Sequence, residues 1–583
     1  MLKFGDYISD IPDSPHLNFA QLLEQISRDH AGKDAILYRS GGQNEFVRWT
    51  FSRYGDECRR VARGLLAAGL VKGDRVVLWA ENRPEWMAVW MGAVIAGISI
   101  VPVDFLITDR ECLNIIKITR ARAIFHSGKK RDFADSLGTQ GVEMAVKVCI
   151  SPPENGGESE FYAFGGDSGG QVLPAADGID GGHPASIVFT SGTTGMAKGV
   201  TLSHKNIIAN ASAAIRILEP NERDVFIDVL PLHHTYPTTC CFIVPLLFGI
   251  PTVIVEKIVG KVVIEDVRDS GVTFLIGVPL LFDKIMTALE AGYNKRIPGI
   301  LKAILKPARR KALEEANNGN ADYGRKKFMF FRKKAGLASI RQMVAGGGPL
   351  NPKTADFFDS LGFNIVHGYG MSENSPLVSV NTERHKRNVS VGLPVSYTEL
   401  RILEPNAEGI GEIACTSPSV MIGYFENEEA TNEVIKEIDG KRWLLTGDLG
   451  KIDSDGFLHI MGRKKNLIVT SAGKNIYPEE IEVMFSSRMI SEILVVGRRA
   501  GDGSGETIFA VIVPNYENIA EDHPGKEGDG TFVRSIMKEL VENANRSLPI
   551  YKKVSGFTLR GEPFEKNAQQ KIKRFMYKEY ENE

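Results

Sequence analysis

The sequence has few cysteines and no long uninterrupted apolar run. Its six cysteines form no C-x-x-C pair and no metal-ligand spacing, which argues against a disulfide scaffold and fits a reducing compartment. The longest uncharged stretches, residues 87–103 and 240–255, each contain glycine and proline. Both are shorter than the roughly 20 residues of a membrane-spanning helix. We therefore expect each of them to form a buried helix followed by a strand.

The chain also lacks an excess of either charge. It has 70 Lys plus Arg against 72 Asp plus Glu, so nucleic-acid binding would need a local basic patch, and we expect no nucleic-acid partner. The 583 residues, 43% of them hydrophobic, are enough to bury a large core, which excludes a peptide-sized module. Acidic Asp6 precedes any apolar run. We therefore expect neither a signal nor a transit peptide, and a cytoplasmic location.

Helical and strand-like segments alternate along the first part of the chain. A helical pattern at 51–69 is followed by short β-branched runs at 75–79 and 98–102, as buried parallel strands require. The stretch 151–183 is rich in Gly, Pro, Asp and Glu and predicts an exposed connection between two α/β halves. These patterns indicate an α/β fold.

The composition changes near residue 463, where a smaller segment begins with expected strands at 492–496 and 508–513. We therefore predict two domains. The first is a large N-terminal domain of stacked α/β subdomains, residues 1–462, and the second is a small C-terminal α+β domain, residues 463–583.

The strongest chemical signal is a loop rich in glycine and hydroxyl groups, residues 190–199. It follows an apolar strand at 185–189 and precedes a helix that begins near 203–205, and its glycines let the backbone curl around an anion. The chain contains no Walker loop and no G-x-G-x-x-G fingerprint. A loop of this kind alone is as often a simple turn. The residues expected to bind polyphosphate are Thr190, Ser191, Gly192, Thr193, Thr194, Gly195 and Lys198.

Three clusters downstream complete a nucleotide site. Residues 346–348 are three glycines, which allow close approach of a flat ring. Residues 367–373 combine a stacking aromatic, a hydroxyl and a carboxylate that could hold Mg²⁺. At 446–448 an aspartate follows a glycine at a turn, where a carboxylate can accept two ribose hydroxyls. Each cluster alone is more often a tight turn.

In this order and spacing, the segments 190–199, 368–373, 446–448 and 462–465 resemble the acyl-adenylate-forming superfamily, which includes acyl-CoA synthetases, luciferases and peptide-synthetase adenylation domains. The resemblance extends from about residue 20 to about residue 575. Arg-Lys-Lys-Asn-Leu-Ile-Val at 463–469, followed by Gly-Lys-Asn-Ile-Tyr-Pro-Glu-Glu-Ile-Glu at 473–482, most resembles bacterial long-chain fatty acid–CoA ligases.

The resemblance implies an ATP-dependent enzyme that activates a medium- or long-chain fatty acid to acyl-AMP and transfers the acyl group to coenzyme A. ATP, Mg²⁺ and coenzyme A are the implied cofactors. The implied catalytic residues are Lys571, Glu373, His234 and Thr193, with Glu373 and Thr190 serving the metal and Lys465 the hinge. The implied cofactor-binding residues besides the 190–198 set are Gly346, Gly347, Gly348, His367, Gly368, Tyr369, Gly370, Met371, Ser372, Asp448, Ile460, Arg463, Gly473 and Lys474.

The resemblance implies that the N-terminal domain, residues 1–462, binds AMP and the acyl group, and that the C-terminal domain, residues 463–583, is mobile and carries the catalytic lysine. Tyr369 stacks on adenine, Asp448 and Arg463 hold the ribose, and Gly473 lies on the loop that lines the pantetheine tunnel. His234, after an apolar strand at 229–232, lies beside the acyl carboxylate, although a vicinal His pair is more often structural.

The sequence departs from the superfamily pattern before the catalytic lysine, where Gln570 replaces the usual glycine. This departure leaves a nucleotide-binding regulator without catalysis as one alternative. An acyl carrier protein as acceptor is a second alternative, because the adenylation residues would be the same. A luciferase-like oxygenase stays formally open, since it shares the first half-reaction.

A basic segment at 295–341 carries fourteen Lys plus Arg against three Asp plus Glu. Apolar residues recur at helical spacing between 297 and 305, and an aromatic run at 328–331 lies between two basic triplets. The pattern fits an amphipathic surface that contacts anionic lipid at the inner membrane face. It also fits a solvated helical hairpin packed on the main domain.

Overall fold

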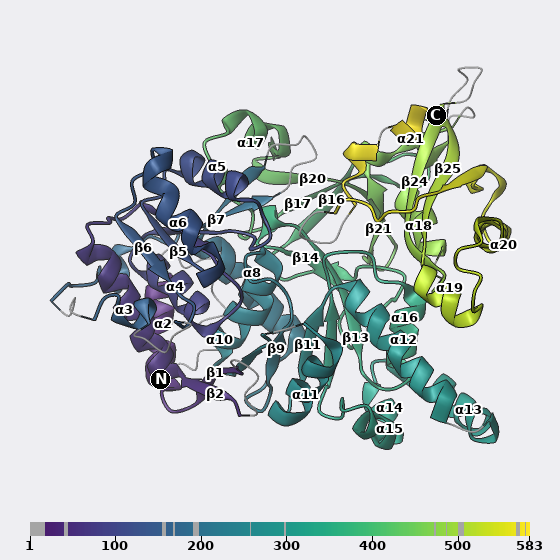
Figure 1. Cartoon of the computed structure of the whole chain (residues 1–583), viewed down its shortest axis with the longest axis horizontal. Coiled ribbons are helices and arrows are strands. Elements are labelled where there is room, and N and C mark those ends of the chain that lie inside the picture. Colours follow the sequence, from purple (N-terminus) through teal and green to yellow (C-terminus); the bar gives the residue numbers. More distant parts are fainter. Residues whose placement is uncertain are drawn as a thin grey trace. The chain divides into compact units, whose positions relative to one another are not determined.

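The computed structural model describes residues 18–39, 45–153, 159–166, 170–190, 197–256, 258–296, 299–470, 474–485, 487–499, 506–566, 572–577 and 579–582. The chain divides into two compact units (Figure 1). Unit 1 comprises Met1–Thr190, Ala197–Leu400 and Cys415–Leu444, and unit 2 comprises Ser191–Met196, Arg401–Ala414 and Leu445–Glu583. Each unit is described by itself. The functional boundary at residue 462 stays a prediction.

A seven-stranded sheet forms one layer of unit 1. Its order is β18 (Gly423–Tyr424), β8 (Lys198–Ser203), β7 (Pro184–Thr190), β4 (Ser99–Pro102), β3 (Arg75–Trp79), β5 (Ala123–His126) and β6 (Val146–Cys149). The strands from β7 to β6 are parallel, whereas β8 is antiparallel to β7 and β18 is antiparallel to β8. The strands expected at 75–79, 98–102 and 185–189 are thereby confirmed.

A nine-stranded sheet forms the second layer of unit 1. Its order is β15 (Leu393–Pro394), β14 (Leu377–Val380), β13 (Ile365–Gly370), β12 (Gln342–Ala345), β11 (Phe274–Gly277), β9 (Phe226–Asp228), β10 (Thr252–Ile254), β1 (Asp34–Tyr38) and β2 (Val47–Thr50). The strands from β13 to β1 are parallel, and the outer ones are antiparallel. Parallel strands need helical crossovers, which explains the α/β alternation.

The helices of unit 1 cover these two sheets. They are α2 (Phe19–Asp29), α3 (Phe51–Ala67), α4 (Pro84–Ile95), α5 (Asp109–Thr119), α6 (Arg131–Ser136), α7 (Glu160–Ala163), α8 (His204–Leu218), α9 (Thr235–Pro237), the π-helix η5 (Thr238–Ile243), α10 (Val244–Phe248), α11 (Gly260–Ser270), α12 (Pro279–Arg296), α13 (Gly299–Asn317), α14 (Ala321–Lys327), α15 (Met329–Lys334), α16 (Pro352–Asp359) and α17 (Glu428–Val434). Every residue of α4 is buried, as an all-round apolar sequence requires.

The two uncharged stretches are helix-then-strand units, as expected: α4 leads to β4, and η5 with α10 leads to β10. Within the described residues, none of the helices combines the length and the apolarity needed to cross a bilayer. The connection 151–183 differs from expectation in one respect. Phe161 in α7 is buried and packs under the Arg60 guanidinium, whose carbon lies 4.5 Å from the centroid of the Phe161 ring. The connection is therefore pinned to α3 rather than exposed throughout.

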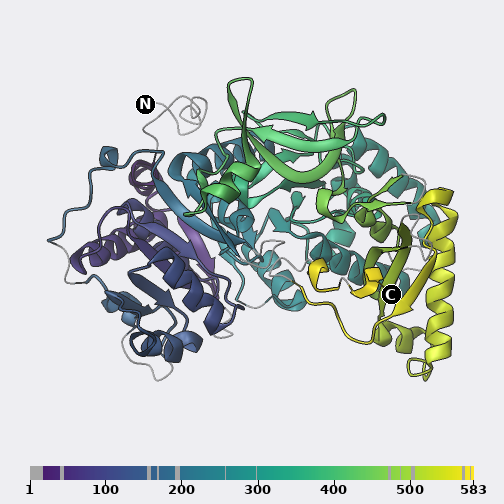
Figure 2. The same ribbon diagram turned by 90° about the horizontal axis from the view of Figure 1, so that it is seen from above.

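Unit 2 is smaller and mixes helices with a three-stranded sheet. β24 (Ile490–Arg499), β25 (Glu506–Pro514) and β26 (Gly556–Leu559) form that sheet, and α18 (Pro478–Met484), α19 (Tyr516–Asp522), α20 (Gly530–Arg546) and α21 (Glu579–Asn582) accompany it. In α20, seen side-on in Figure 2, Val533, Met537, Val541 and Ala544 recur at helical spacing and are buried. This α+β arrangement was expected.

A five-stranded sheet contains the boundary between the units. Its order is β16 (Glu399–Leu403), β17 (Gly411–Thr416), β20 (Lys441–Ile452) and β19 (Ile435–Ile438), with β21 (Leu458–Arg463) paired to β20. The unit boundaries fall within β16, β17 and β20. After β21, the short pair β22 (Ile468–Val469) and β23 (Asn475–Ile476) leads into α18.

The basic segment forms α13, α14 and α15, and these helices pack against other parts of unit 1. Arg332 is fully buried, donates to the carbonyl oxygens of Gly362 and Ile340, and lies 4.1 Å from the Phe363 ring centroid. Burial lowers its pKa to about 9. The expectation that the whole segment faces lipid is therefore wrong at Arg332 and at the buried Phe328. Replacing a buried, hydrogen-bonded Arg leaves its acceptors without partners.

Candidate functional site

The predicted site residues of unit 1 lie where parallel strands end. β7 ends at Thr190, β12 ends immediately before Gly346, and β13 ends at Gly370, followed by η6 (Ser372–Asn374) with Glu373. In open α/β sheets, ligands bind outside the carboxyl ends of the strands. The fold thus gathers the predicted nucleotide-binding segments of unit 1 in the kind of place where such sites occur.

The glycine- and hydroxyl-rich loop is closed by a pair of strands. Thr190 and Lys198 are register partners at the ends of β7 and β8. The Thr190 hydroxyl points to the Lys198 carbonyl oxygen at 3.5 Å, so the two ends meet. Ser191, Gly192, Thr193, Thr194 and Gly195 lie outside the described residues, and their roles stay predictions.

A chain of contacts links this loop to the predicted metal ligand. The Tyr424 hydroxyl, on the two-residue strand β18, donates to Glu373 Oε1 at 2.9 Å. Lys198 Nζ lies 5.0 Å from the centroid of the Tyr424 ring. It also lies 3.8 Å from Glu433 Oε2. Tyr424 therefore orients the carboxylate through its hydroxyl and contacts the lysine through its ring, a role that the sequence analysis missed.

The turn that carries Glu373 is fixed from two sides. Gly370 has no room for a side chain, because a Cβ there would lie 2.3 Å from the Pro376 carbonyl oxygen. Asn210 on α8 donates to the carbonyl oxygens of Asn374 and Leu377 at 2.9 and 3.0 Å. The Glu373 carbonyl oxygen accepts from the Met421 backbone N–H at 2.8 Å. The carboxylate is thus presented by a rigid turn.

The three glycines after β12 have an unexpected neighbour. A Cβ on Gly346 would lie 2.8 Å from the Tyr236 ring, and the Tyr236 hydroxyl donates to the Val344 carbonyl oxygen at 3.2 Å. The flat ring that lies against Gly346 is therefore a side chain of the protein itself. Gly347 has φ +82°, a left-handed conformation that favours glycine. Gly348 accepts through its carbonyl from His367 Nε2 at 2.9 Å.

Burial lowers the pKa of His367 to about 4, so this histidine is a neutral structural donor that ties β13 to the glycine run. Tyr369 and Met371 are half-buried beside the cluster formed by Val378, Cys415, Val420 and Leu444. Gly368 is closely covered, with a hypothetical Cβ at 3.3 Å from the Leu377 and Val380 side chains. The Ser372 hydroxyl accepts from the Thr235 hydroxyl at 3.3 Å, which joins η6 to α9.

The His233–His234 pair follows a turn rather than a strand. We expected a strand at 229–232, but β9 ends at Asp228. Asn82 explains the turn: its amide donates to Asp228 Oδ2 at 2.7 Å and to the Leu230 carbonyl oxygen at 2.6 Å, and its oxygen accepts from the Leu232 N–H at 2.9 Å. This long-range clamp leaves no signal in the local sequence.

The two histidines have different environments. His233 is buried, and burial lowers its pKa to about 3, so it is neutral at ordinary pH. His234 is half-buried and begins α9, with its ring centroid 4.1 Å from that of His233. The geometry favours His234 over His233 as the residue available to a ligand, in line with the sequence-based choice, and its role stays a prediction.

Asp228 gives a pH prediction for this turn. Burial raises its pKa to about 7 from 3.8, against the hydrogen bonds from Leu230 N–H, Asn82 and Cys241. Because the folded-state pKa lies above the unfolded one, the folded state binds more protons between the two values, and stability falls as pH rises from about 4 to 7. In Asp228→Asn this contribution is absent. We expect the free energy of unfolding of the variant, relative to that of the wild type, to rise by about 2 to 3 kcal/mol between pH 5 and pH 8.

Urea unfolding of both proteins at the two pH values measures this difference. The variant also loses one hydrogen-bond acceptor, but this lowers its free energy of unfolding equally at both pH values. The change between the two pH values therefore reports only the ionisation of Asp228. Equal pH dependence in the two proteins would show that Asp228 is ionised in the folded state at pH 5.

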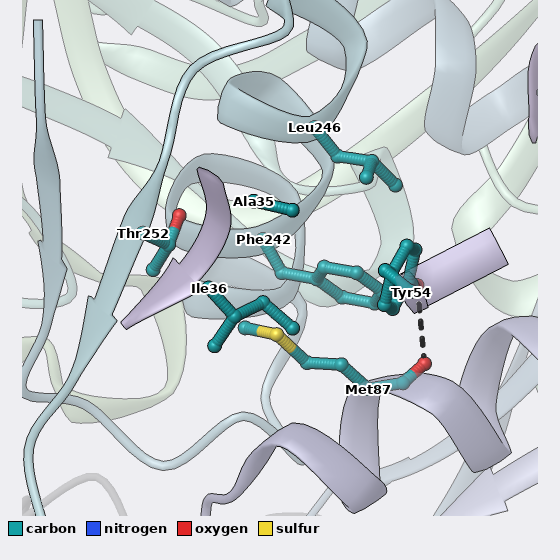
Figure 3. Close-up of a pocket in the computed structure, with 7 residues that line it drawn as sticks. All are labelled: Ala35, Ile36, Tyr54, Met87, Phe242, Leu246 and Thr252. Carbon is teal, nitrogen blue, oxygen red and sulfur yellow. Dashed lines mark hydrogen bonds between the residues drawn. The ribbon is translucent and has the colours of Figure 1, made fainter. Parts of the chain in front are cut away.

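A small cavity lies behind the π-helix (Figure 3). It has a volume of about 10 Å³, and Phe242 of η5, Tyr54 of α3 and Met87 of α4 are among its lining residues. The Tyr54 hydroxyl donates to the Met87 carbonyl oxygen at 3.3 Å. The space is about that of one water molecule. It is therefore a packing defect of the core and too small for an acyl chain.

Unit 2 contains the predicted ribose-binding pair. Asp448 and Arg463 are register partners on β20 and β21, with Arg463 Nε 2.7 Å from Asp448 Oδ1. Asp448 is buried, whereas the Arg463 side chain is exposed. Thr446 fixes the turn, because its hydroxyl donates to the Ile413 carbonyl oxygen at 2.8 Å and accepts from the Asp448 N–H at 3.1 Å. The structure therefore brings together Asp448 and Arg463, as expected.

Of the remaining predicted residues of unit 2, Ile460 lies on β21, and Lys465 and Lys474 follow it in the chain. Ile460 pairs with Gly450 and is half-buried, and Lys465 is exposed on a 3₁₀ turn directly after β21. Lys474 is exposed, and its backbone bonds with Thr470. Gly473 and Lys571 lie outside the described residues. Lys465 is exposed after β21, and its role as the hinge stays a prediction.

The residues around Glu373 fit a magnesium ion that arrives with a polyphosphate. Among the described residues, no group of three or more His, Cys, Asp and Glu side chains is placed to hold a metal. Mg²⁺ needs no such cage, because it is commonly bound by one or two carboxylates together with substrate phosphates. Glu373 is a half-buried carboxylate, oriented by Tyr424, that meets this requirement.

Comparisons with known proteins identify a matching family model and similar sequences. A family model described as AMP-binding enzyme matches residues 23–425. Long-chain-fatty-acid–CoA ligase ACSBG2 of Gallus gallus is 27% identical over 553 residues, which cover 91% of this chain and 70% of that protein. Long-chain-fatty-acid–CoA ligase FadD15 of Mycobacterium bovis is 27% identical over 508 residues, covering 83% and 80% of the two chains.

Solved structures share the fold. The anthranilate CoA ligase AuaEII in complex with anthranoyl-AMP has a TM-score of 0.78 at 20% identity, with 98% of this chain and 99% of that chain covered. The o-succinylbenzoate CoA synthetase MenE of Bacillus subtilis, in complex with its acyl-adenylate intermediate, has a TM-score of 0.72 at 21% identity, covering 97% and 98%. The matched family model spans more than half of the chain, from α2 through β18. This chain therefore belongs to the AMP-binding enzyme family.

Proposed function

We propose that this protein is an AMP-forming ligase that joins a fatty acid, of medium or long chain, to coenzyme A. In the first half-reaction the carboxylate of the acid attacks the α-phosphorus of ATP, and acyl-AMP and pyrophosphate form. In the second, the thiol of coenzyme A attacks the acyl carbonyl, the bond to the AMP phosphate breaks, and acyl-CoA, AMP and a proton leave.

One observation carries the proposal. The Lys198–Tyr424–Glu373 contacts place a cation and an oriented carboxylate at the closed base of the glycine- and hydroxyl-rich loop. A polyphosphate chelating Mg²⁺ presents both kinds of charge, so it matches a lysine and a carboxylate that contact the same tyrosine. A loop that only reverses the chain direction would not require a lysine and a carboxylate that contact the same tyrosine.

The chain's own residues have distinct tasks in the first half-reaction. Thr190 and Glu373 would hold Mg²⁺, which neutralises phosphate charge when it is bound. Lys198 and the hydroxyls of the loop donate to phosphate oxygens, and Lys571 stabilises charge on the transferring group. Tyr369 contacts adenine, and Asp448 with Arg463 accepts and donates hydrogen bonds at the ribose. His234 orients the acyl carboxylate at the N-terminus of α9.

The second half-reaction requires a different arrangement. We propose that the domain from residue 463 onward turns about Lys465, so that Lys571 withdraws and the loop containing Gly473 faces the thiol path. The lysine that favours adenylation would otherwise obstruct the thiol. One site can then support two incompatible steps.

The fatty-acid substrate rests on the relatives. Both curated relatives described above are named long-chain-fatty-acid–CoA ligases. The solved structures with the same fold carry aromatic acyl-adenylates, which makes an aromatic acid the matched competitor in any test.

The experiment is acid-dependent release of pyrophosphate and AMP, measured with saturated acids of increasing chain length and with benzoate and anthranilate. Each acid is tested with coenzyme A, with an acyl carrier protein and with neither acceptor. We expect pyrophosphate release with fatty acids and AMP release that depends on coenzyme A. Acceptor preference for the carrier protein would overturn the coenzyme A assignment, and no pyrophosphate with any acid would indicate a non-catalytic nucleotide-binding protein.

A further inference from the structure

The helices α14 and α15 present one exposed basic stripe with an aromatic ring at its centre. Lys326 and Lys327 lie one turn before Phe330, and Lys333 and Lys334 lie one turn after it. Residues three and four apart share one face of a helical segment. All five side chains are exposed, so we name this surface the Phe330 face.

The opposite side of the same segment is firmly packed. Phe328 and Arg332 are buried, and Gly324 lies so close to Gly362 that a Cβ on Gly324 would be 2.9 Å from the Gly362 backbone. The exposure of Phe330 is therefore not a sign of a loose segment. Phe330 is 77% exposed, although Phe328 and Arg332, two residues before and after it, are buried and anchor the backbone.

The lysines of the Phe330 face keep their charge available. Within the described part of the chain, none of the four forms an ion pair with a carboxylate, whereas the nearby Asp322 pairs with Arg325. Lys334 Nζ lies 5.7 Å from the centroid of the Phe330 ring. Four cations thus surround one apolar ring with no described acid to neutralise them.

The chain just after α15 contacts α11, a helix with an exposed apolar residue. Gly336, just after α15, lies against α11, since a Cβ there would be 2.7 Å from Ile264 Cγ2. The Ile264 side chain is partly exposed, and the chain enters α11 through the exposed Ile258 and Val259. Figure 1 shows α11, α14 and α15 in the same region of unit 1. Unit 1 therefore exposes apolar side chains at α11 and just before it as well as at Phe330.

We propose that the Phe330 face docks this protein on a membrane surface rich in anionic lipid. The four lysines match the negative headgroups, and the exposed ring matches the boundary between headgroups and acyl chains. Nucleic acid would satisfy the charges, but a duplex gives no environment for an exposed apolar ring. The surface is narrower than the whole basic segment, because Arg332 belongs to the fold.

The test uses the full-length protein and sedimentation with phosphatidylcholine vesicles containing 0 or about 30% phosphatidylglycerol. We expect binding only to the anionic vesicles and its loss at high salt, because exposed charges are screened beyond about 8 Å at physiological ionic strength. Each Lys→Gln change should lower the partition coefficient about fivefold, so that Lys326, Lys327, Lys333 and Lys334 together account for several hundredfold. Phe330→Ser should lower it about tenfold with the lysines intact.

A matched control replaces four exposed lysines elsewhere in unit 1, namely Lys117, Lys147, Lys353 and Lys436, with Gln. It has the same net charge as the quadruple variant and should keep at least half of the vesicle binding. Equal loss in both variants would show that net charge alone causes binding and would overturn the proposal. Binding that survives the quadruple change would do the same, as would binding to duplex DNA that the Phe330 face variants abolish while vesicle binding is unchanged.

Vesicle binding is measured without ATP or acid. Its result therefore tests the membrane proposal independently of the proposed ligase activity. Circular dichroism and urea unfolding check that each variant folds, and only surface side chains are changed. Arg332 is left in place in every variant, because its removal would unfold the segment that carries the face.

Discussion

Replacing Lys571 with alanine is expected to lower the rate of adenylate formation about 10²- to 10³-fold while leaving thioester formation from supplied acyl-AMP within about twofold. The reason is that this cation acts on charge at the transferring phosphoryl group, which exists only in the first half-reaction. Separate assays of pyrophosphate release from ATP and of acyl-CoA formation from synthetic acyl-AMP measure the two effects.

Lys571 lies outside the described residues, but both flanks of its segment are anchored in unit 2. Lys566 pairs with Ile572 in an isolated β-bridge, and Lys566 Nζ lies 2.5 Å from Glu492 Oε1. The ring centroids of Phe564 and Tyr577 are 4.9 Å apart. Loss of the lysine side chain should therefore leave the surrounding fold unchanged.

Lys573→Ala is the matched control for Lys571→Ala. The Lys573 backbone N–H donates to the Glu565 carbonyl oxygen at 2.9 Å, a bond that alanine keeps. We expect this variant to retain both half-reactions. Equal loss of both half-reactions in Lys571→Ala would count against its role, and loss of adenylation only in Lys573→Ala would move the role by two residues.

Glu373→Gln is expected to lower the adenylation rate about 100-fold and to raise the Mg²⁺ concentration needed for half-maximal rate. The amide keeps the shape and can still accept from the Tyr424 hydroxyl, but it lacks the charge that anchors a hard cation. A magnesium titration of pyrophosphate release gives both numbers. An unchanged titration would exclude Glu373 as a metal ligand.

Tyr424→Phe provides the graded comparison for Glu373→Gln. It removes the 2.9 Å hydrogen bond to Glu373 while keeping the carboxylate and the ring near Lys198. Partners that orient a ligand typically contribute about 10-fold or more to metal affinity. We expect Tyr424→Phe to fall between the wild type and Glu373→Gln. A larger loss in Tyr424→Phe than in Glu373→Gln would contradict this order and would mean that the Tyr424 hydroxyl contributes more than the orientation of Glu373.

Most of the fold could be predicted from local patterns. The runs at 75–79, 185–189, 492–496 and 508–513 all lie within observed strands, because β-branched apolar runs bounded by polar turns have few other buried conformations. The helix start near Ser203 was also predicted correctly. There the Ser203 hydroxyl accepts from the Asn206 N–H, and the Asn206 side chain accepts from the Ser203 N–H.

The parts of the site that could not be predicted depend on contacts between distant residues. Tyr424 is 51 residues from Glu373, and Asn82 is 146 residues from Asp228. No local pattern specifies such pairs. Arg332 shows the converse failure: its neighbours Lys333 and Lys334 are exposed, and nothing in a basic triplet tells which member the fold buries.

The pairing of Thr190 with Lys198 supports the glycine- and hydroxyl-rich loop from outside, so the residues that support the loop differ from those expected to bind the ligand. The width of its base is set by an antiparallel residue pair, about 4.5 to 5.5 Å between Cα atoms, whatever residues stand between 190 and 198. Lengthening a loop with fixed ends costs little free energy, about 0.6 kcal/mol for each doubling. Insertions and substitutions here can therefore alter ligand preference without unfolding the sheet, so the loop can diverge in evolution while its scaffold is retained.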